Sequence, residues 1–79
     1  MSKQEKLLAK ARQSPNNLTF DEFETLLSQS GWIFKRQNGS HRVWLSPNNQ
    51  VLPIQSDQGK AKKYQIKQAL ILMMEHNDE

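Results

Sequence analysis

The sequence predicts a small α+β domain in which helices cover one face of a three-stranded antiparallel sheet. Two long segments carry apolar residues at helical spacing. Between them lie three short segments rich in strand-forming residues, separated by sequences typical of tight turns. The expected order is therefore α-β-β-β-α, preceded by one additional helix.

Length and composition agree with one domain. The chain has 79 residues, of which 35% are hydrophobic, enough for a single thin core. It has no cysteine, which excludes disulfide frameworks, thiolate zinc sites, iron–sulfur clusters and cysteine nucleophiles. No apolar run approaches the roughly 20 residues of a membrane span, and lysines interrupt any signal-peptide pattern near Met1. We therefore expect a soluble cytoplasmic protein with no membrane association and no cofactor.

Positive charge is concentrated in the second half of the chain. The net charge is +3, but residues 31–70 hold seven basic side chains and one acidic side chain, a local charge of +6. Such a concentration is typical of a site for a polyanion such as RNA. A basic face that meets only solvent is the alternative.

A first helix is predicted over residues 3–13, because the segment Ser2–Glu5 has the capping-box pattern. Residues 14–17, Ser-Pro-Asn-Asn, then end the helix with a turn. This helix has only a narrow apolar stripe. We therefore expect residues 1–17 to be an accessory element and residues 18–79 to form the main domain.

The second helix is predicted over residues 19–30. Thr19 and Glu22 form another capping box, and Leu18 and Phe23 are spaced as a hydrophobic staple. Gly31 follows where a left-handed C-cap is favoured. The predicted apolar face comprises Phe20, Phe23, Leu26 and Leu27.

A β-hairpin is predicted next. Residues 32–37 and 40–45 are rich in strand formers, and the Asn38-Gly39 pair between them is favoured in two-residue type I′ turns. With that turn, three cross-strand pairs share one face of the sheet. They are Trp32 with Leu45, Phe34 with Val43, and Arg36 with His41.

A third strand is predicted over residues 50–54, after a turn at residues 46–49. A loop of two or four residues keeps Leu52 and Ile54 on the face that carries Val43. The predicted core face thus comprises Trp32, Phe34, Val43, Leu45, Leu52 and Ile54. The outer face is expected to carry Ile33, Lys35, Arg42 and Trp44, where an aromatic ring between cations could stack on a base or contact a partner protein.

The last predicted element is a helix over residues 60–76. Its apolar stripe has the spacing i, i+3, i+4 and i+7, and Tyr64 could extend it by a turn. The residues of the stripe are Ile66, Ala69, Leu70 and Met73.

The candidate catalytic residue is His41, in the tripeptide Gly39-Ser40-His41 at the predicted hairpin tip. The predicted register places it on the inward side of the sheet, at its end and opposite Arg36. Histidine is the residue type best suited to proton transfer near neutral pH. A strand histidine that makes a structural hydrogen bond is the alternative. Ser40 cannot complete a triad with its neighbour, because successive strand residues point to opposite faces.

A second cluster comprises Lys60, Lys62 and Lys63, at the predicted start of the last helix. Cations are unfavourable there, because a helix N-terminus already carries partial positive charge. The lysines are better explained if a bound anion completes the site. A solvated lysine run is the alternative. Carboxylates for a two-metal nuclease are missing from the basic segment, which has only Asp57, so no metal site is expected.

These residues resemble the HicA (YcfA-like) toxin family. The resemblance spans roughly Leu18 to Met74 and is carried by a helix ending in Gly31-Trp32, by Asn38-Gly39-Ser40-His41-Arg42-Val43-Trp44, by Leu52-Pro53-Ile54 and by the lysine-led last helix. The chain departs from the family pattern after Pro53, where Gln55 and Ser56 replace a basic or histidine residue common in members.

The resemblance implies a double-stranded-RNA-binding-domain-like fold and a ribosome-independent mRNA endoribonuclease, silenced by a HicB-type antitoxin. It implies that His41 is catalytic and that residues 18–79 are the catalytic domain. Gly39 and Ser40 are the other residues of the Gly-Ser-His motif that contains His41. The expected contacts to RNA phosphates are Arg36, Arg42, Lys60, Lys62 and Lys63. The alternatives are a non-catalytic double-stranded-RNA-binding module and a protein that binds no nucleic acid.

Overall fold

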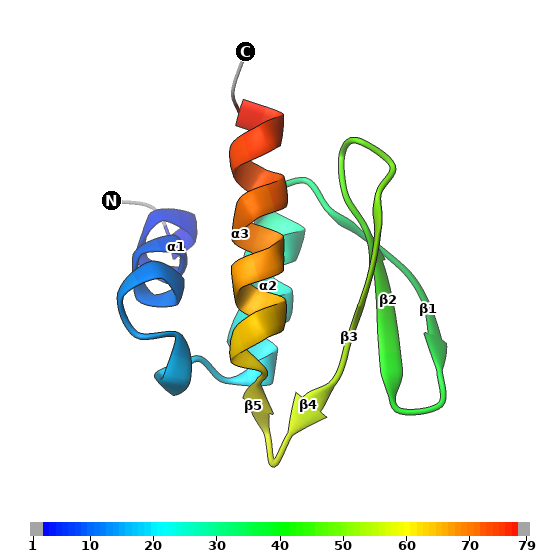
Figure 1. The fold of residues 1–79 in the computed structure, drawn as a ribbon, viewed down its shortest axis with the longest axis horizontal. Coiled ribbons are helices and arrows are strands. Elements are labelled where there is room, and N and C mark those ends of the chain that lie inside the picture. Colours follow the sequence, from blue (N-terminus) through cyan, green and yellow to red (C-terminus); the bar gives the residue numbers. More distant parts are fainter. Residues whose placement is uncertain (1–2, 78–79) are drawn as a thin grey trace.

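The computed structural model describes residues 3–77, and the side chains of residues 5–73. In chain order the elements are α1 (Lys3–Gln13), η1 (Pro15–Asn17), α2 (Phe20–Gln29), β1 (Ile33–Asn38), β2 (His41–Leu45), β3 (Val51–Ile54), β4 (Ser56–Asp57), β5 (Lys60–Ala61) and α3 (Lys63–Asn77). Strands β1, β2 and β3 form an antiparallel sheet in that order. The helices lie to one side of it, with α1 farthest from the sheet (Figure 1). The predicted α+β order is confirmed.

Helix α2 begins and ends as its sequence predicts. The Glu22 N–H donates to Thr19 Oγ1 at 3.1 Å, and the Thr19 N–H donates to Glu22 Oε1 at 3.0 Å, which is the reciprocal capping box. After the helix, Gly31 has a φ of +88°, a conformation that favours glycine. Phe23, Leu26 and Leu27 are buried, as expected for the apolar face.

Helix α1 has the predicted bounds and packs against the rest of the core. Ala11 is only 1% exposed and belongs to the same hydrophobic cluster as Phe23. At the edge of this contact, Lys10 Nζ lies 2.9 Å from Glu22 Oε1. The predicted N-terminal cap at Ser2 lies outside the described residues.

The first hairpin has a different turn from the predicted one. Asn38 pairs with His41, so the two-residue turn is Gly39-Ser40. Of these two turn residues only Gly39 has a positive φ, +64°, as in a type II′ turn with glycine at its first central position. The predicted type I′ turn at Asn38-Gly39 is therefore wrong, because Asn38 continues strand β1.

The loop between β2 and β3 holds an odd number of residues. The Ser46 N–H donates to the Gln50 carbonyl at 2.9 Å, which leaves residues 47–49 as the loop. The Asn49 N–H donates to the Ser46 carbonyl at 2.9 Å, and Asn49 has a φ of +64°. A turn followed by one left-handed residue is the common form of three-residue hairpin loops. The expected loop of two or four residues is wrong.

These two differences exchange the faces of the sheet. Trp44 lies opposite Phe34 and Leu52, with a bulge between Phe34 and Arg36. Trp44 and Leu52 belong to the core cluster, whereas Val43 is buried at 6% exposure on the opposite face, outside that cluster, and Leu45 is half-buried. The predicted faces of Val43, Leu45 and Trp44 are therefore wrong, although Val43 is buried, and Phe34 is 39% exposed at the margin. The predicted burial of Trp32, Leu52 and Ile54 is confirmed.

The segment before α3 forms a second small hairpin instead of a helical turn. Gln58 and Gly59 have φ values of +55° and +83°, and they connect Asp57 to its partner Lys60. The Ala61 N–H donates to the Leu18 carbonyl at 3.1 Å. Because Lys60 and Ala61 pair with Asp57 and Ser56, they form strand β5, and α3 begins at Lys63.

The stripe predicted for the last helix is confirmed within α3. Ile66, Ala69 and Met73 are buried and Leu70 packs against them, whereas Tyr64 is 62% exposed and does not extend the stripe. Within residues 3–77, no helix is both long and apolar enough to cross a membrane.

Candidate functional site

The hairpin tip presents His41 to solvent. His41 is the first residue of β2, is exposed, and lies on the outer face with Val43, away from the helices. Its cross-strand partner is Asn38, whereas Arg36 lies opposite Val43. The predicted inward position of His41 and its pairing with Arg36 are therefore wrong, because the turn is one residue later than expected and β1 is bulged. Both residues nevertheless share the outer face.

A chain of side-chain hydrogen bonds connects the hairpin tip to the lysine cluster. Gln55 Nε2 donates to Ser40 Oγ at 3.0 Å, and Gln55 Oε1 accepts from Lys62 Nζ at 3.2 Å. Gln55 follows β3, and extending the Arg42–Ile54 pairing by one residue puts it across from His41. A lysine ammonium thus lies near the end of the sheet that carries the histidine.

The backbone N–H of Gln55 is bonded to the side chain of Gln65. Gln65 is only 4% exposed, and its Oε1 accepts the Gln55 N–H at 3.0 Å. Since a buried amide without partners is costly, this bond stabilises the exit of the chain from β3. Sequence reasoning missed both glutamines, and a polar residue within the apolar stripe of α3 was the only signal for Gln65.

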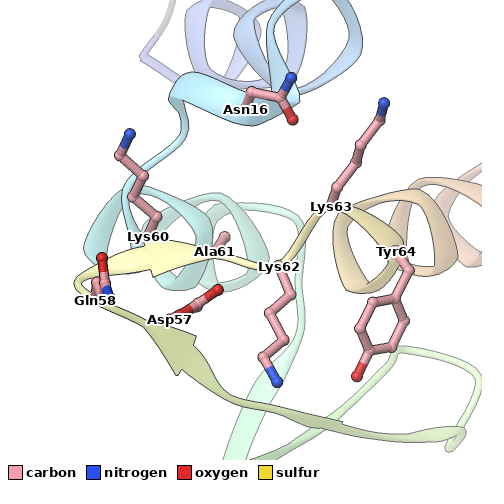
Figure 2. A pocket seen from close by; sticks show the side chains of 8 residues that line it. All are labelled: Asn16, Asp57, Gln58, Lys60, Ala61, Lys62, Lys63 and Tyr64. Carbon is pink, nitrogen blue, oxygen red and sulfur yellow. The ribbon is translucent and has the colours of Figure 1, made fainter.

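The three predicted lysines come together around a pocket of about 480 Å³. Lys60 belongs to β5, Lys62 lies in the connection, and Lys63 is the first residue of α3. Figure 2 shows the Lys60 and Lys63 side chains extending toward the side of the pocket where Asn16 lies, and Lys62 extending to the opposite side. The cluster is therefore assembled from a hairpin and a helix start, not from one helical turn as predicted.

Arg42 and Trp44 contact helix α2. Arg42 Nε and Trp44 Nε1 both donate to Oε2 of Glu24, the indole at 3.0 Å. The Arg42 guanidinium carbon lies 4.2 Å from the centre of the Phe34 ring, a cation–π contact. The predicted place of Arg42 and Trp44 on the outer face is wrong. Sequence reasoning missed Glu24 because it placed Trp44 on the outer face, where an indole N–H can donate to water.

An apolar strip crosses the outer face of the sheet. Ile33 lies opposite Leu45, and Leu45 lies opposite Val51. Ile33 is 64% exposed and Val51 is 54% exposed. Directly opposed residues share a face, so the three side chains form one strip on the face that also carries His41.

Metal-binding groups are not found in the described part of the chain, where no three His, Asp or Glu side chains gather closely enough to hold an ion.

Comparison with known proteins identifies a family. A family model described as HicA toxin of bacterial toxin–antitoxin matches residues 20–73. The matched range contains the hairpin tip, Gln55 and the lysine pocket's β-hairpin and helix start. No curated protein and no solved structure matches the chain.

Proposed function

The chain belongs to the HicA toxin family of bacterial toxin–antitoxin systems, and from this premise we propose that it is an endoribonuclease that cleaves mRNA in the cytoplasm without the ribosome. Its family makes it the toxin of such a system, with an antitoxin as partner.

One observation carries the proposal. The hydrogen bonds from Ser40 through Gln55 to Lys62 bring an ammonium group to the end of the sheet where His41 is exposed. A base and a nearby cation are the two groups that cleavage by a ribose 2′-hydroxyl requires, one to remove a proton and one to stabilise the charged phosphorus centre.

The proposed reaction is an internal transesterification of RNA. His41 accepts the proton of the 2′-hydroxyl, and the 2′-oxygen forms a bond to the adjacent phosphorus. The bond from phosphorus to the 5′-oxygen of the next nucleotide breaks, and water or a lysine protonates that oxygen. The products are a 2′,3′-cyclic phosphate and a 5′-hydroxyl end, and the lysine ammonium stabilises the negative charge that grows on the phosphate oxygens.

Neighbouring phosphates are proposed to bind the remaining cations. Lys60, Lys63 and Arg36 have no acidic partner among the ion pairs of the described side chains. Arg42 differs, because it is paired with Glu24 on the helix-facing side, so its proposed part is to support the hairpin that carries His41.

The antitoxin is proposed to be of the HicB type and to cover the hairpin tip and the lysine pocket. The basic segment attracts an acidic partner as it attracts RNA. Ile33 and Val51 are exposed apolar side chains on this face and can anchor the partner, whereas Trp44, expected as an anchor from the sequence, is buried against α2.

The test is RNA cleavage by the protein purified free of antitoxin, with and without the substitution His41→Ala. We expect wild type to cut single-stranded RNA and to inhibit growth, and H41A to do neither while it still binds RNA. Wild-type protein that binds duplex RNA and leaves every RNA uncut would instead be a double-stranded-RNA-binding module.

A further inference from the structure

Gln55 is the only described side chain that bonds both to the residue before His41 and to a lysine of the pocket. We propose that Gln55 is a positioning residue that holds Lys62 beside the hairpin tip, so that Lys62, and not Lys60 or Lys63, acts with His41 at the cleaved phosphate. This inference rests on the proposed ribonuclease function and divides the lysines between two tasks.

Gln55 is held at its backbone and at both ends of its side-chain amide. Its amide uses both of its ends, the nitrogen as donor to Ser40 Oγ at 3.0 Å and the oxygen as acceptor from Lys62 Nζ at 3.2 Å. Its backbone N–H is held by the buried Gln65. A side chain fixed at the backbone and at both ends of its amide can hold two surface groups at a constant separation.

The lysines of the pocket extend to two different sides. Lys62 is half-buried and extends to the side of the pocket opposite Asn16, whereas Lys60 and Lys63 are exposed and extend toward Asn16 (Figure 2). Lys62 is also the lysine bonded to Gln55. The structure thus gives Lys62 a fixed place near the tip and leaves the other two free to follow the RNA backbone.

This division predicts two different kinetic effects. A group that stabilises charge in the transition state affects kcat, whereas a group that binds a flanking phosphate affects KM. We expect K62A and Q55L to lower kcat by roughly 10- to 100-fold, the effect of misplacing a catalytic group. We expect K60A and K63A to weaken RNA binding and leave kcat near the wild-type value.

The experiment measures kcat and KM on a fluorogenic single-stranded RNA for wild type, Q55L, K62A and the double variant Q55L/K62A. If Gln55 acts through Lys62, the double variant is no slower than K62A alone, because the two losses are not additive. Lys67→Ala is the matched control, since it removes an exposed α3 lysine outside the pocket lining. Additive losses, or a Q55L variant with normal kcat, would overturn the proposal.

Gln55→Glu separates positioning from folding. A glutamate keeps an acceptor for Lys62 and can accept from the Ser40 hydroxyl, but its charge neutralises the ammonium. We expect Q55E to keep the wild-type stability and a well-dispersed ¹H–¹⁵N spectrum of the folded protein, and yet to cleave RNA more slowly. Q55E with full activity would contradict the role of Lys62.

The same spectra test the connection without any cleavage. Q55L and K62A should shift the amide signals of Ser40 and His41, and K60A and K63A should leave them in place. If the Ser40 and His41 amide signals of K62A equal those of wild type, Gln55 does not connect Lys62 to the hairpin tip, even if the enzyme is active. If these signals shift in K62A but wild-type protein cuts no RNA, the connection through Gln55 is supported and the ribonuclease proposal fails.

Discussion

The Glu24 carboxylate accepts a hydrogen bond from the Trp44 indole at 3.0 Å, and this bond joins helix α2 to the inner face of the sheet. Trp44 is 6% exposed, so its N–H has lost access to most solvent and depends on this acceptor. The same oxygen accepts from Arg42, whose guanidinium covers the Phe34 ring. One carboxylate therefore satisfies two donors of β2, the strand that begins with His41.

Removing the Glu24 carboxylate is expected to destabilise the protein. Glu24→Ala leaves a buried indole N–H and a guanidinium without their acceptor, at a cost of about 2 kcal/mol. Urea unfolding followed by tryptophan fluorescence measures the change. Thr25→Ala, an exposed position of the same helix, should change the free energy of unfolding by less than about 0.5 kcal/mol. Equal stabilities of E24A and T25A would show that the bond contributes nothing.

Acid should remove the stabilising effect of Glu22. The side-chain hydrogen bond from Lys10, and next the backbone N–H of Thr19, hold the pKa of the Glu22 carboxyl below its ordinary value of 4.5. A pKa lowered in the folded state adds stability above the unfolded pKa, and this stability is lost as the pH falls through the folded pKa. The effect therefore operates at neutral pH and disappears in the acid range below 4.5.

The variant Glu22→Gln tests this sign. E22Q should be less stable than wild type at pH 7, and the difference should shrink as the pH falls below 4.5. Asp21→Asn, an exposed change in the same helical turn, serves as the control for the helix dipole. A difference between E22Q and wild type that stays constant from pH 7 to pH 3 would contradict the assignment.

Local signals in the sequence predicted helices well and strand faces poorly. The capping box at Thr19 and the left-handed Gly31 act within a few residues, and α2 has the bounds that they indicate. A strand face depends on the parity of its loops, and one residue more or less moves every side chain to the other side. The three-residue loop 47–49 puts Trp44, and not Val43, on the face that carries Leu52.

The candidate site was predictable in its residue types and not in its geometry. The tripeptide ending in His41 and the three lysines were identified from local pattern and charge. That Gln55 connects them depends on how β3 leaves the sheet, which a buried residue of α3, Gln65, determines. Contacts between segments distant in the chain have no local signal, so the sequence alone could not show which lysine lies nearest to the tip.

Reversing the charge of the lysine pocket is expected to weaken both RNA and antitoxin binding. The triple variant Lys60→Glu, Lys62→Glu and Lys63→Glu replaces cations on a pocket of about 480 Å³ with anions. If the three lysines contact RNA phosphates, the slope of log affinity against log salt should fall in magnitude by about 2. Fluorescence anisotropy at several salt concentrations measures this slope. An unchanged slope would place the RNA elsewhere.

The antitoxin is expected to exclude RNA from the hairpin tip. If the antitoxin covers the hairpin tip, RNA and antitoxin compete, and labelled RNA should be released as antitoxin is added to the inactive H41A protein. A ternary complex in native mass spectrometry would contradict this. The apolar strip should distinguish antitoxin binding from RNA binding, because Ile33 and Val51 offer hydrophobic contact to a protein and little to a phosphate backbone.

Ile33→Ser and Val51→Ser should therefore weaken antitoxin binding more than RNA binding. Both side chains are more than half exposed, so their replacement should cost the fold little. Antitoxin affinity should also fall less steeply with salt than RNA affinity, since part of the protein contact is apolar and releases no counterions. If both serine variants bind antitoxin as tightly as wild type does, the antitoxin does not use the apolar strip.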